Sequence, residues 1–434
     1  MGTSVRSVQP SRPGPAQTCK VALVGFGTVG SAVARLLLAR AHEHPFQLTH
    51  ICNRNVQRKK ADWVPGTVRW TDDIDEILAS DANIVVELVG GLQPAYDWAC
   101  RALESGKSVV TANKQLIAHH GSELLDLARA SQQHLAFGAC VAGGVPVLSG
   151  LYDGLAGDRL FKVRGILNGT CNYILTRIEQ LGASFDEALK EAQQAGFAEA
   201  DPTDDVDGPD ARAKLVVLAR VGLNADVKPQ QVLCRSIRDL VTVDFEYAHD
   251  LGCTVRQISR AELRDGQFFA AVEPALVPQG SPLASVSGSQ NMVMSTGEFG
   301  GETVFSGHGA GGNPTAVAVV SDLLQLLRYR SPGAQAPDRP DARPYEVSGD
   351  FETPHYLRFV VKDSPGIISS LAGILSKYQI NIDAVFQRPG HDKAALPFVI
   401  TLEVCKTSRV EAAIAEMRQF AFLVQAPLRM PILR

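Results

Sequence analysis

The sequence predicts an α/β protein: a doubly wound parallel sheet of the Rossmann type, then a second α+β domain, then a small C-terminal domain of ferredoxin-like order. Three observations predict this arrangement. Apolar strand-like runs alternate with amphipathic helical runs through the first third of the chain, which is typical of a parallel sheet. A glycine-rich turn joins the first of these strands to its helix. A proline-rich segment, residues 331–354, precedes a tail with strand and helix patterns of its own.

The composition is that of a globular chain with a large core. The 434 residues are 45% hydrophobic and 20% charged, with a formal net charge of −4, and we expect a soluble protein of two or three domains. The weak negative charge leaves no basic surface for nucleic acid, and no apolar run is long enough to cross a membrane. The eight cysteines have no metal-binding spacing, which favours a reducing, cytoplasmic location. Residues 1–18 lack the apolar core of a signal peptide and are expected to be a disordered lead-in.

The first domain, expected over residues 19–144, opens with a dinucleotide-binding pattern. KVALV is a short apolar strand, GFGTVG follows it, and SAVARLLLAR has the period of an amphipathic helix. The three glycines allow a tight turn and close approach to a pyrophosphate, which the helix N-terminus then faces. The residues expected to contact the cofactor in this turn are Gly25, Phe26, Gly27, Thr28, Val29 and Gly30.

The alternation continues along this domain. Further strands are expected near residues 48–53 and in NIVVELVG, SVVTA and HLAFGA, with helices near 94–104 and 122–130. Ligands of such sheets bind at the carboxyl ends of the strands. SVVTANK places Thr111, Asn113 and Lys114 just past one such end, where we expect contacts to the cofactor or substrate. A surface lysine at a turn is the alternative for Lys114.

The end of the second strand bears on the choice of cofactor. NAD-specific proteins usually carry Asp or Glu there, to bind the ribose 2′-hydroxyl. This chain has ICNRN instead, followed by further cations. Arg54 is therefore the expected contact to a 2′-phosphate, and the pattern predicts NADP, with NAD possible.

The second domain, expected over residues 145–306 for catalysis and dimerisation, contains an unusually acidic stretch. It reads GFAEADPTDDVDGPDARAK, from Gly196 to Lys214. A solvated turn is one interpretation. An EF-hand calcium loop is excluded, because Gly208 at its sixth position would put Lys214 where a bidentate carboxylate is required. An active-site loop that gathers carboxylates around a cationic group is the third interpretation.

The residues that end this stretch predict an ion pair on a helix. Gly208 and Pro209 are typical of a helix start, so Asp210 and Lys214 stand four residues apart on one face. A surface pair of little energetic value is one interpretation. A pocket for an amino-acid substrate fits better, since carboxylates bind an ammonium group and a lysine serves a reacting oxygen. Substrate contacts are also expected from a turn upstream, for which a purely structural role is the alternative: Asn168, Gly169 and Thr170.

Several longer blocks make the sequence resemble the homoserine dehydrogenase family. AQQAGFAEADPTDDVDGPDARAK matches the family signature at each defined position, and GFGTVG, TANK, VAGGVP, NGTCNYIL and GHGAGGNPTA look like its other blocks, in its order. The resemblance covers nearly the whole chain beyond the lead-in. It implies reversible NAD(P)H-dependent reduction of L-aspartate 4-semialdehyde to L-homoserine, in threonine, methionine and isoleucine biosynthesis.

The resemblance also implies roles for individual residues. Lys214 is expected to donate the proton to the aldehyde oxygen, with Lys114 its partner near cofactor and substrate. Asp205 would organise the polar network around the reacting group, as the third catalytic residue. Glu199 and Asp210 would hold the substrate. Further cofactor contacts are expected from the acidic stretch and a second glycine-rich turn: Gly196, Gly309, Ala310 and Gly311.

One departure from the family concerns a monovalent cation, Na⁺ or K⁺. The family often has a glutamate at the position of Gly138. The ligands that the resemblance leaves are the backbone carbonyls of Val141, Gly143 and Val145. Because these are neutral, the sequence predicts a weaker site.

The rest of the chain is expected to return to the first domain over residues 307–330, cross a linker over 331–354 and form a regulatory domain over 355–434. There HYLRFVVKD, a helix after SPG, INIDAVFQR, PFVITLEV and TSRVEAAIAEMRQF give a βαββα order, the last helix with Ser408 and Glu411 as a capping box. With its KDSPGI opening, this order resembles an ACT domain. The resemblance implies L-threonine as effector and a homo-oligomer, a dimer or tetramer; a plain dimerisation module is the alternative.

Two other functions stay open on the sequence. A phosphorylating semialdehyde dehydrogenase needs a nucleophilic cysteine beside a base, for which Cys140 and Cys171 are candidates by position. A non-catalytic amino-acid sensor that kept an inactive dehydrogenase is the other. The presence of both Lys114 and Lys214 favours an enzyme.

Overall fold

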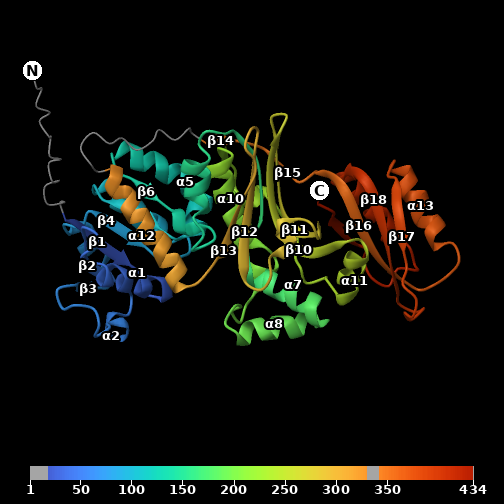
Figure 1. Cartoon of the computed structure of the whole chain (residues 1–434), viewed down its shortest axis with the longest axis horizontal. Helices are drawn as coiled ribbons and strands as arrows, with labels where there is room; N and C mark the ends of the chain where they lie inside the picture. Colours follow the sequence, from blue (N-terminus) through green and yellow to red (C-terminus); the bar gives the residue numbers. More distant parts are fainter. Residues whose placement is uncertain (1–17, 330–341, 434) are drawn as a thin grey trace, which may run out of the picture.

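A computed structural model describes residues 18–329 and 342–433. Its three folded parts lie in a row along the long axis (Figure 1): the N-terminal domain in blue and teal, a middle domain in green and yellow, and the tail in red. The predicted architecture is therefore confirmed. The expected lead-in, apart from its last residue, and the first part of the expected linker lie outside the described residues.

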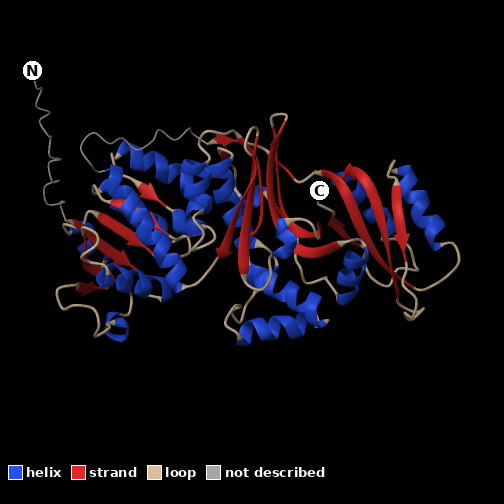
Figure 2. Cartoon of the chain, in the orientation of Figure 1, coloured by secondary structure: helices blue, strands red, loops and turns tan. Residues whose placement is uncertain are grey.

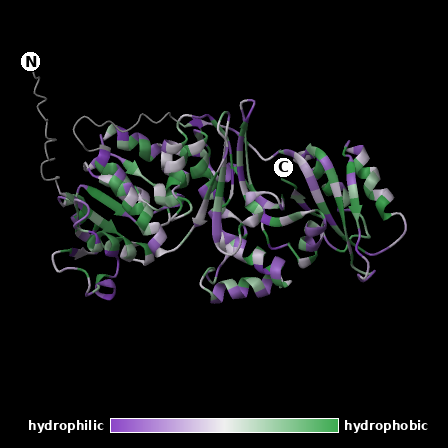
Figure 3. Ribbon diagram, viewed as in Figure 1, coloured by the Kyte–Doolittle hydropathy of each residue, from purple (hydrophilic) through white to green (hydrophobic). Residues whose placement is uncertain are grey.

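The first domain is an all-parallel sheet with the order β3-β2-β1-β4-β5-β6. The strand order reverses between β1 and β4, and ligands of such sheets bind at the carboxyl ends beside this reversal. Figure 3 shows hydrophobic residues concentrated on these strands, as a sheet covered on both faces requires. The strands are β1 (Cys19–Val24), β2 (Phe46–Cys52), β3 (Arg69–Thr71), β4 (Ile84–Glu87), β5 (Ser108–Thr111) and β6 (Leu135–Ala136). The helices are α1 (Thr28–Ala39), α2 (Val56–Lys59), α3 (Ile74–Ala79), α4 (Ala95–Glu104) and α5 (Lys114–Ala130).

Helix α12 (Gly312–Tyr329) completes this domain from far along the chain. Figure 1 shows it lying across the first domain, and it packs on α1. Its apolar residues Ala316, Val319 and Leu323 are buried in one core with Val33 of α1. The chain therefore leaves the first domain and later returns to it. Residues on α12 can thus contact the segment after β6, where the chain first leaves this domain.

The middle domain is built on a second sheet with the order β13-β12-β7-β10-β11-β15, with β9 also paired to β11 (Figure 2). The strands are β7 (Leu160–Ile166), β9 (Leu233–Cys234), β10 (Cys253–Arg264), β11 (Gln267–Pro278), β12 (Gln290–Gly297), β13 (Gly301–His308) and β15 (Val347–Ser348). The helices are α6 (Val147–Ser149), α7 (Gly169–Leu181), α8 (Phe185–Gln194), α9 (Thr203–Val206), α10 (Pro209–Gly222) and α11 (Thr242–Asp250). Helix α10 contacts both β7 and α5, so it stands at the junction with the first domain.

The described part of the expected linker is not free. Its short strand β14 (Arg343–Pro344) pairs with β8 (Ala225–Asp226), and β15 pairs with β11. These contacts attach the segment to the middle domain before the tail begins. The sequence did not predict β14 and β15, because each strand is only two residues long and shows no apolar period.

The tail folds as one antiparallel sheet, β17-β18-β16-β19, with α13 and α14. Its order is βαββαβ, so the sequence missed the last strand. The capping-box prediction is wrong: α14 begins at Thr407, and Asp350 accepts hydrogen bonds from the Ser408 N–H at 2.7 Å and hydroxyl at 2.9 Å. Glu411 pairs with arginines instead. The elements are β16 (Glu352–Val361), α13 (Ile367–Lys377), β17 (Ile382–Phe386), β18 (Leu396–Lys406), α14 (Thr407–Met417) and β19 (Leu428–Pro431).

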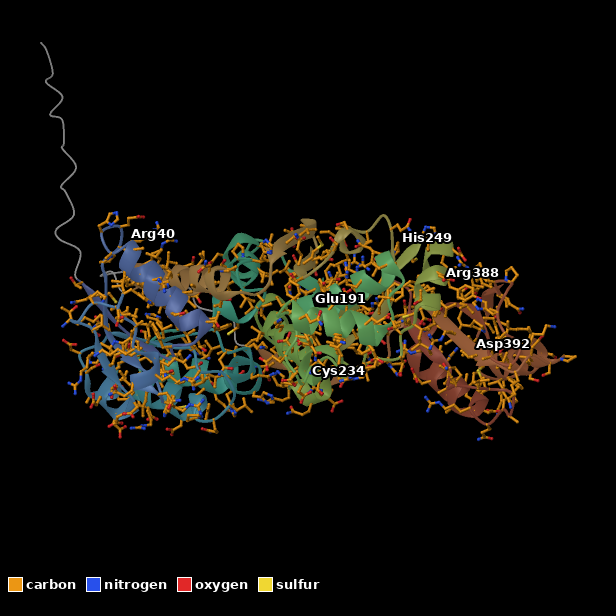
Figure 4. All side chains as sticks on the ribbon, turned by 90° about the horizontal axis from the view of Figure 1, so that it is seen from below. Arg40, Glu191, Cys234, His249, Arg388 and Asp392 are labelled. Carbon is orange, nitrogen blue, oxygen red and sulfur yellow. The ribbon has the colours of Figure 1, made fainter. Side chains whose placement is uncertain are left out.

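Ion pairs join the tail to the middle domain. Arg388 pairs with Glu246 at 2.8 Å and Asp250 at 2.7 Å, both on α11, and Figure 4 shows Arg388 close to His249 of that helix. Deeper inside, Arg358 pairs with the fully buried Asp244.

Candidate active site

A cleft of about 310 Å³ opens at the carboxyl ends of β1, β2 and β4. Gly25, Phe26, Gly27 and Arg54 line it, as the sequence predicts for a dinucleotide site. Gly25 has φ +105°, and a Cβ on Gly30 would come within 3.0 Å of the Gly25 carbonyl carbon, so both positions require glycine. A Cβ on Gly27 would meet nothing within 4 Å, which leaves its backbone open to a ligand. Thr28, Val29 and Gly30 form the first turn of α1 behind it.

Asp72 and Lys59 also line this cleft, and the sequence reading missed Asp72. The usual position of such a carboxylate is the end of the second strand, whereas Asp72 follows β3. The parallel register that pairs Cys52 with Thr71 brings Asp72 to the same edge as Arg54. The cleft therefore offers a carboxylate for a ribose hydroxyl and cations for a phosphate.

Glu87, at the end of β4, is a second residue that the sequence reading missed. It is 2% exposed, and its carboxylate accepts hydrogen bonds from the N–H groups of Val89 at 2.8 Å and Gly90 at 3.2 Å and from the Thr111 hydroxyl at 2.5 Å. Glu87 thus ties the loop after β4 to the end of β5. Because the Thr111 hydroxyl serves Glu87, the contact between Thr111 and the cofactor stays a prediction.

The loop after β5 fixes the position of Lys114. Asn113 caps α5 by accepting a hydrogen bond from the Leu116 N–H at 3.1 Å. Its amide also donates to the Gly91 carbonyl at 2.6 Å. Lys114 is therefore the first residue of a helix whose start is held to the cofactor cleft.

Two lysines from two domains share one carboxylate. Lys114 Nζ on α5 lies 3.0 Å from Asp210 Oδ1, and Lys214 Nζ on α10 lies 2.7 Å from Asp210 Oδ2. Lys214 also donates to the Leu167 carbonyl at 2.7 Å. Gly208, with φ +95°, and Pro209 start α10 as the sequence predicts, which sets Asp210 and Lys214 on one helical face.

Asn168 joins this cluster from the second sheet. It caps α7 by accepting from the Cys171 N–H at 2.8 Å, and its amide donates to Asp205 at 2.6 Å and Asp210 at 2.9 Å. Burial alone would raise the pKa of the Asp210 carboxyl, but the Lys214 and Lys114 ammonium groups hold it well below its usual range. Burial raises the pKa of Asp205.

This environment stabilises the charged form of Lys114. The Asp210 carboxylate raises the pKa of Lys114, so its ammonium group stays charged at neutral pH. The Lys114 side chain is 34% exposed, whereas that of Lys214 is 13% exposed. The cluster is thus held on one side by protein and reached by solvent on the other.

The other predicted contacts differ in how close they lie to this cluster, and Thr170 is beside Asp205. Thr170 donates to the Phe197 carbonyl at 2.7 Å, and Gly169 packs so closely that a Cβ would meet the Ser289 carbonyl oxygen at 2.6 Å. Gly196 and Glu199 lie exposed on the loop before α9. Within the described residues the Glu199 side chain makes no hydrogen bond or ion pair, so its contact with a substrate stays a prediction.

The second glycine-rich turn lies against the start of α1. A Cβ on Gly312 would come within 3.1 Å of Thr28, and a Cβ on Gly143 within 2.8 Å of the Gly309 carbonyl oxygen. Gly312, which directly follows Gly309, Ala310 and Gly311, therefore borders the cofactor turn, and the nicotinamide contact of those three residues stays a prediction.

The cysteine alternative is not supported by the geometry. Burial raises the pKa of the Cys140 and Cys171 thiols well above its usual value, which leaves them protonated and poorly nucleophilic. Cys140 contacts the Thr111 carbonyl and Cys171 the Asp205 carbonyl. Both are packing residues.

In residues 18–329 and 342–433 no group of three or more His, Cys, Asp or Glu side chains could hold a metal ion. No helix in that part is long and apolar enough to span a membrane.

Three family models match this chain in sequence order. They are "Homoserine dehydrogenase, NAD binding domain" over residues 25–138, "Homoserine dehydrogenase" over 146–324 and "ACT domain" over 355–422. Homoserine dehydrogenase of Mycobacterium tuberculosis is 38% identical over 418 residues, which cover 93% of this chain and 94% of that protein.

Solved structures agree with these matches. A homoserine dehydrogenase from Thiobacillus denitrificans has a TM-score of 0.89 at 32% identity, covering 96% of this chain and 98% of that one. A hyperthermophilic archaeal homoserine dehydrogenase in complex with NADPH has a TM-score of 0.63 at 25% identity, covering 75% of this chain and 100% of that one. With its nucleotide-type cleft beside a two-lysine cluster, and with relatives matched over nearly its full length, this chain belongs to the homoserine dehydrogenase family.

Proposed function

We propose that the chain reduces L-aspartate 4-semialdehyde to L-homoserine, reversibly, with Lys214 as the proton donor. The observation that supports this most directly is the sharing of Asp210 by Lys114 and Lys214 between the nucleotide domain and the middle domain. A bound nicotinamide dinucleotide supplies the hydride. A reaction of this kind also needs one proton for the aldehyde oxygen, and an ammonium group held at a buried carboxylate can deliver it.

The residues around Lys214 orient its ammonium group and stabilise charge on the substrate. The Leu167 carbonyl and Asp210 orient its ammonium group. Lys114 keeps its charge because of Asp210, and it stabilises negative charge on the substrate. Asp205 is held through Asn168 and fixes the orientation of Asp210. These are the three catalytic residues that we propose.

Glu199 and Asp210 hold the amino group of the substrate in this proposal, and Asn168, Gly169 and Thr170 line its pocket. Glu199 sits on an exposed loop, so it would engage only when substrate is present. Glu199→Ala is expected to raise KM for the semialdehyde and leave cofactor affinity nearly unchanged. Weakened cofactor affinity alone would place Glu199 elsewhere.

For the cofactor we propose NADP, with NAD also accepted. Arg54 and Lys59 in the cleft favour a 2′-phosphate, while Asp72 offers an acceptor for a 2′-hydroxyl. The similar archaeal homoserine dehydrogenase is a complex with NADPH. Contacts from the rest of the predicted set complete the site: Gly25 to Gly30, Thr111, Gly196 and Gly309 to Gly311.

We propose that a monovalent cation binds the carbonyls of Val141, Gly143 and Val145. The loop has residues in left-handed backbone conformation, Ala142 at φ +54° and Gly143 at φ +42°. Such turns aim successive carbonyls away from regular hydrogen bonding. Na⁺ and K⁺ are the ions that this oxygen set fits.

We also propose that the ACT domain binds L-threonine, which regulates the enzyme in a biosynthetic route to threonine, methionine and isoleucine. Exposed apolar side chains on this domain, such as Val385 at 44% and Val404 at 46%, support a homo-oligomer, a dimer or tetramer. All eight cysteines are free, which supports a cytoplasmic location.

One assay tests the reaction and separates it from the alternatives. Oxidation of NADPH is followed with L-aspartate 4-semialdehyde, before and after alkylation of thiols. The proposal expects phosphate-independent turnover that survives alkylation. The same mixture with NADP⁺ and phosphate in place of NADPH tests the cysteine mechanism, which oxidises the aldehyde: formation of NADPH that requires phosphate and is lost on alkylation would indicate it. No turnover in either direction would indicate a sensor.

A further inference from the structure

The carboxylate of Asp322 occupies the space that a side chain at position 138 would need. Gly138 lies at the turn after β6. Asp322 lies on α12, which follows β13 of the middle domain in the chain. A Cβ added to Gly138 would come within 3.1 Å of the Asp322 Cγ and closer still to its Oδ1. The carboxylate of Asp322 therefore stands where a side chain at position 138 would begin.

The surroundings are buried and rich in carbonyl oxygens. Asp322 is 7% exposed and Val141 is fully buried. Among the described residues, no hydrogen bond is donated to the carbonyls of Val141 or Gly143, while Val145 accepts one from the Val147 N–H at 2.7 Å. Buried carbonyls without a donor are costly, and a cation removes that cost.

A cavity reaches this place. It has a volume of about 300 Å³ and is lined by Gly138, Val145 and Asp322, among others. Asp153 lines its outer part, where it accepts a hydrogen bond from Gln325 at 3.2 Å. A small ion can therefore enter from solvent.

We propose that Asp322 supplies the carboxylate of the monovalent-cation site, alongside the carbonyls of Val141, Gly143 and Val145. This inference rests on the cation site proposed above. A carboxylate adds a charged oxygen to a set of neutral carbonyls, which strengthens the attraction for a cation. The ion is the Na⁺ or K⁺ of the site proposed above.

The site then links two distant parts of the chain. Asp322 is on the helix that packs against α1, and the carbonyls belong to the segment after β6, where the chain passes from the first domain to the middle domain. A bound cation stabilises the contact between α12 and this segment, and it should raise the midpoint of unfolding. The site is then stronger than neutral carbonyls alone would make it.

The first experiment measures thermal unfolding in NaCl or KCl against choline chloride at equal ionic strength. For the wild-type chain the midpoint should rise with Na⁺ or K⁺ concentration beyond the rise in choline. Asp322→Asn, which keeps the size and removes the charge, should weaken the apparent affinity at least about tenfold. Asp153→Asn is the matched control in the same cavity and should respond like wild type.

The second experiment changes positions 138 and 322, first one alone and then both together, to move the carboxylate from Asp322 to position 138. Gly138→Ala should destabilise the chain, since its Cβ has no room beside Asp322, and should be tolerated when Asp322 is also changed to Ala. Gly138→Glu combined with Asp322→Ala should regain the cation-dependent rise. This double variant decides the question if Asp322→Asn does not fold.

The outcomes are distinct. A full cation response in Asp322→Asn would overturn the role of Asp322 and leave the carbonyl site standing. A double variant without cation response, in a folded protein, would also overturn it. A wild-type chain that responds equally to choline would remove the cation site itself.

Discussion

Two junctions of this chain use the same chemistry and differ in burial. At the candidate active site Asp210 lies between Lys114 and Lys214, and the Lys114 side chain is 34% exposed. At the junction with the ACT domain Glu273 lies between Arg260 and Arg429, whose side chains are 10% and 2% exposed. The carboxylate that solvent and ligand can reach is the one we assign to chemistry, and the one enclosed between two buried arginines is the one we assign to structure.

The residues around each junction follow this difference. Lysine is a compact charge that can release a proton, whereas arginine stays charged and binds carboxylates in a fixed fork. Around the ACT junction, Tyr356 and Met430 of the tail are buried in one core with Tyr247 and Leu276 of the middle domain. The tail is thus part of the folded body.

A tail attached only by a linker could be removed near residue 331 with catalysis intact. Removal here would take Arg429 from Glu273, which keeps Arg260, and Arg358 from Asp244. It would also expose the apolar core that the tail shares with the middle domain, which destabilises what remains. Regulation is better tested in the full chain.

The largest effect is expected at the exposed junction. Lys214→Ala should lower kcat by about 10²–10⁴, the range for losing a general acid, and the helix should tolerate Ala. Steady-state kinetics and circular dichroism on the same preparation measure both. Near-normal turnover by a folded Lys214→Ala protein would refute the proton-donor assignment.

The sealed junction should be the acid-sensitive one. His355 is buried beside Arg429, Glu273 and Arg260 and contacts the Cys405 carbonyl. Burial, with the charge of Arg429, lowers its pKa to about 4. The unfolded chain, with a histidine pKa of about 6.5, then binds more protons, so the free energy of unfolding should fall by up to about 3 kcal/mol between pH 6.5 and 4.

His355→Gln should remove that part of the slope, while the exposed His249→Gln should keep it. Denaturant unfolding at several pH values measures the effect. At the active site Asp210 should stay charged over the same window, since its pKa lies below its usual range. Equal slopes for wild type and His355→Gln would show that other groups carry the pH dependence.

Threonine should act through the ACT junction and not through the lysine cluster. Inhibition by millimolar threonine is expected with a coupling of about 1–3 kcal/mol. It should not be competitive with the semialdehyde. Purely competitive inhibition would mean that threonine binds in the homoserine pocket, and no inhibition would make the ACT domain an assembly module or the sensor of another ligand.

The smallest effect is expected at the cofactor end of the cleft. Arg54→Ala should lower kcat/KM for NADPH about tenfold, through loss of a charge-assisted contact, and affect NADH less. The exposed neighbour Lys60→Ala, which does not line the cleft, is the control. A strong preference of the wild type for NADH would contradict the cofactor proposal and point to Asp72.

Local patterns predicted most of the fold and the central cluster. The glycine-rich turn and the strand–helix alternation are short-range signals, and Asp210 with Lys214 is a four-residue spacing on one helix. The residues that the sequence did not predict are brought into place by the order of the strands in the sheet and by the return of the chain to the first domain. Asp72 and Glu87 reach the cleft only through parallel neighbours, and Asp322 meets Gly138 only because α12 returns to the first domain.

The most direct test of the comparison measures two matched variants in two ways. Asp210→Asn and Glu273→Gln each remove one shared carboxylate charge at nearly constant size. We predict that Asp210→Asn lowers kcat by about 10²-fold or more with the smaller loss of unfolding free energy. Glu273→Gln should lower the unfolding free energy by about 3 kcal/mol and leave kcat within about twofold of wild type. The reverse pattern, or two variants that lose activity and stability in the same proportion, would contradict the assignment of one junction to chemistry and the other to structure.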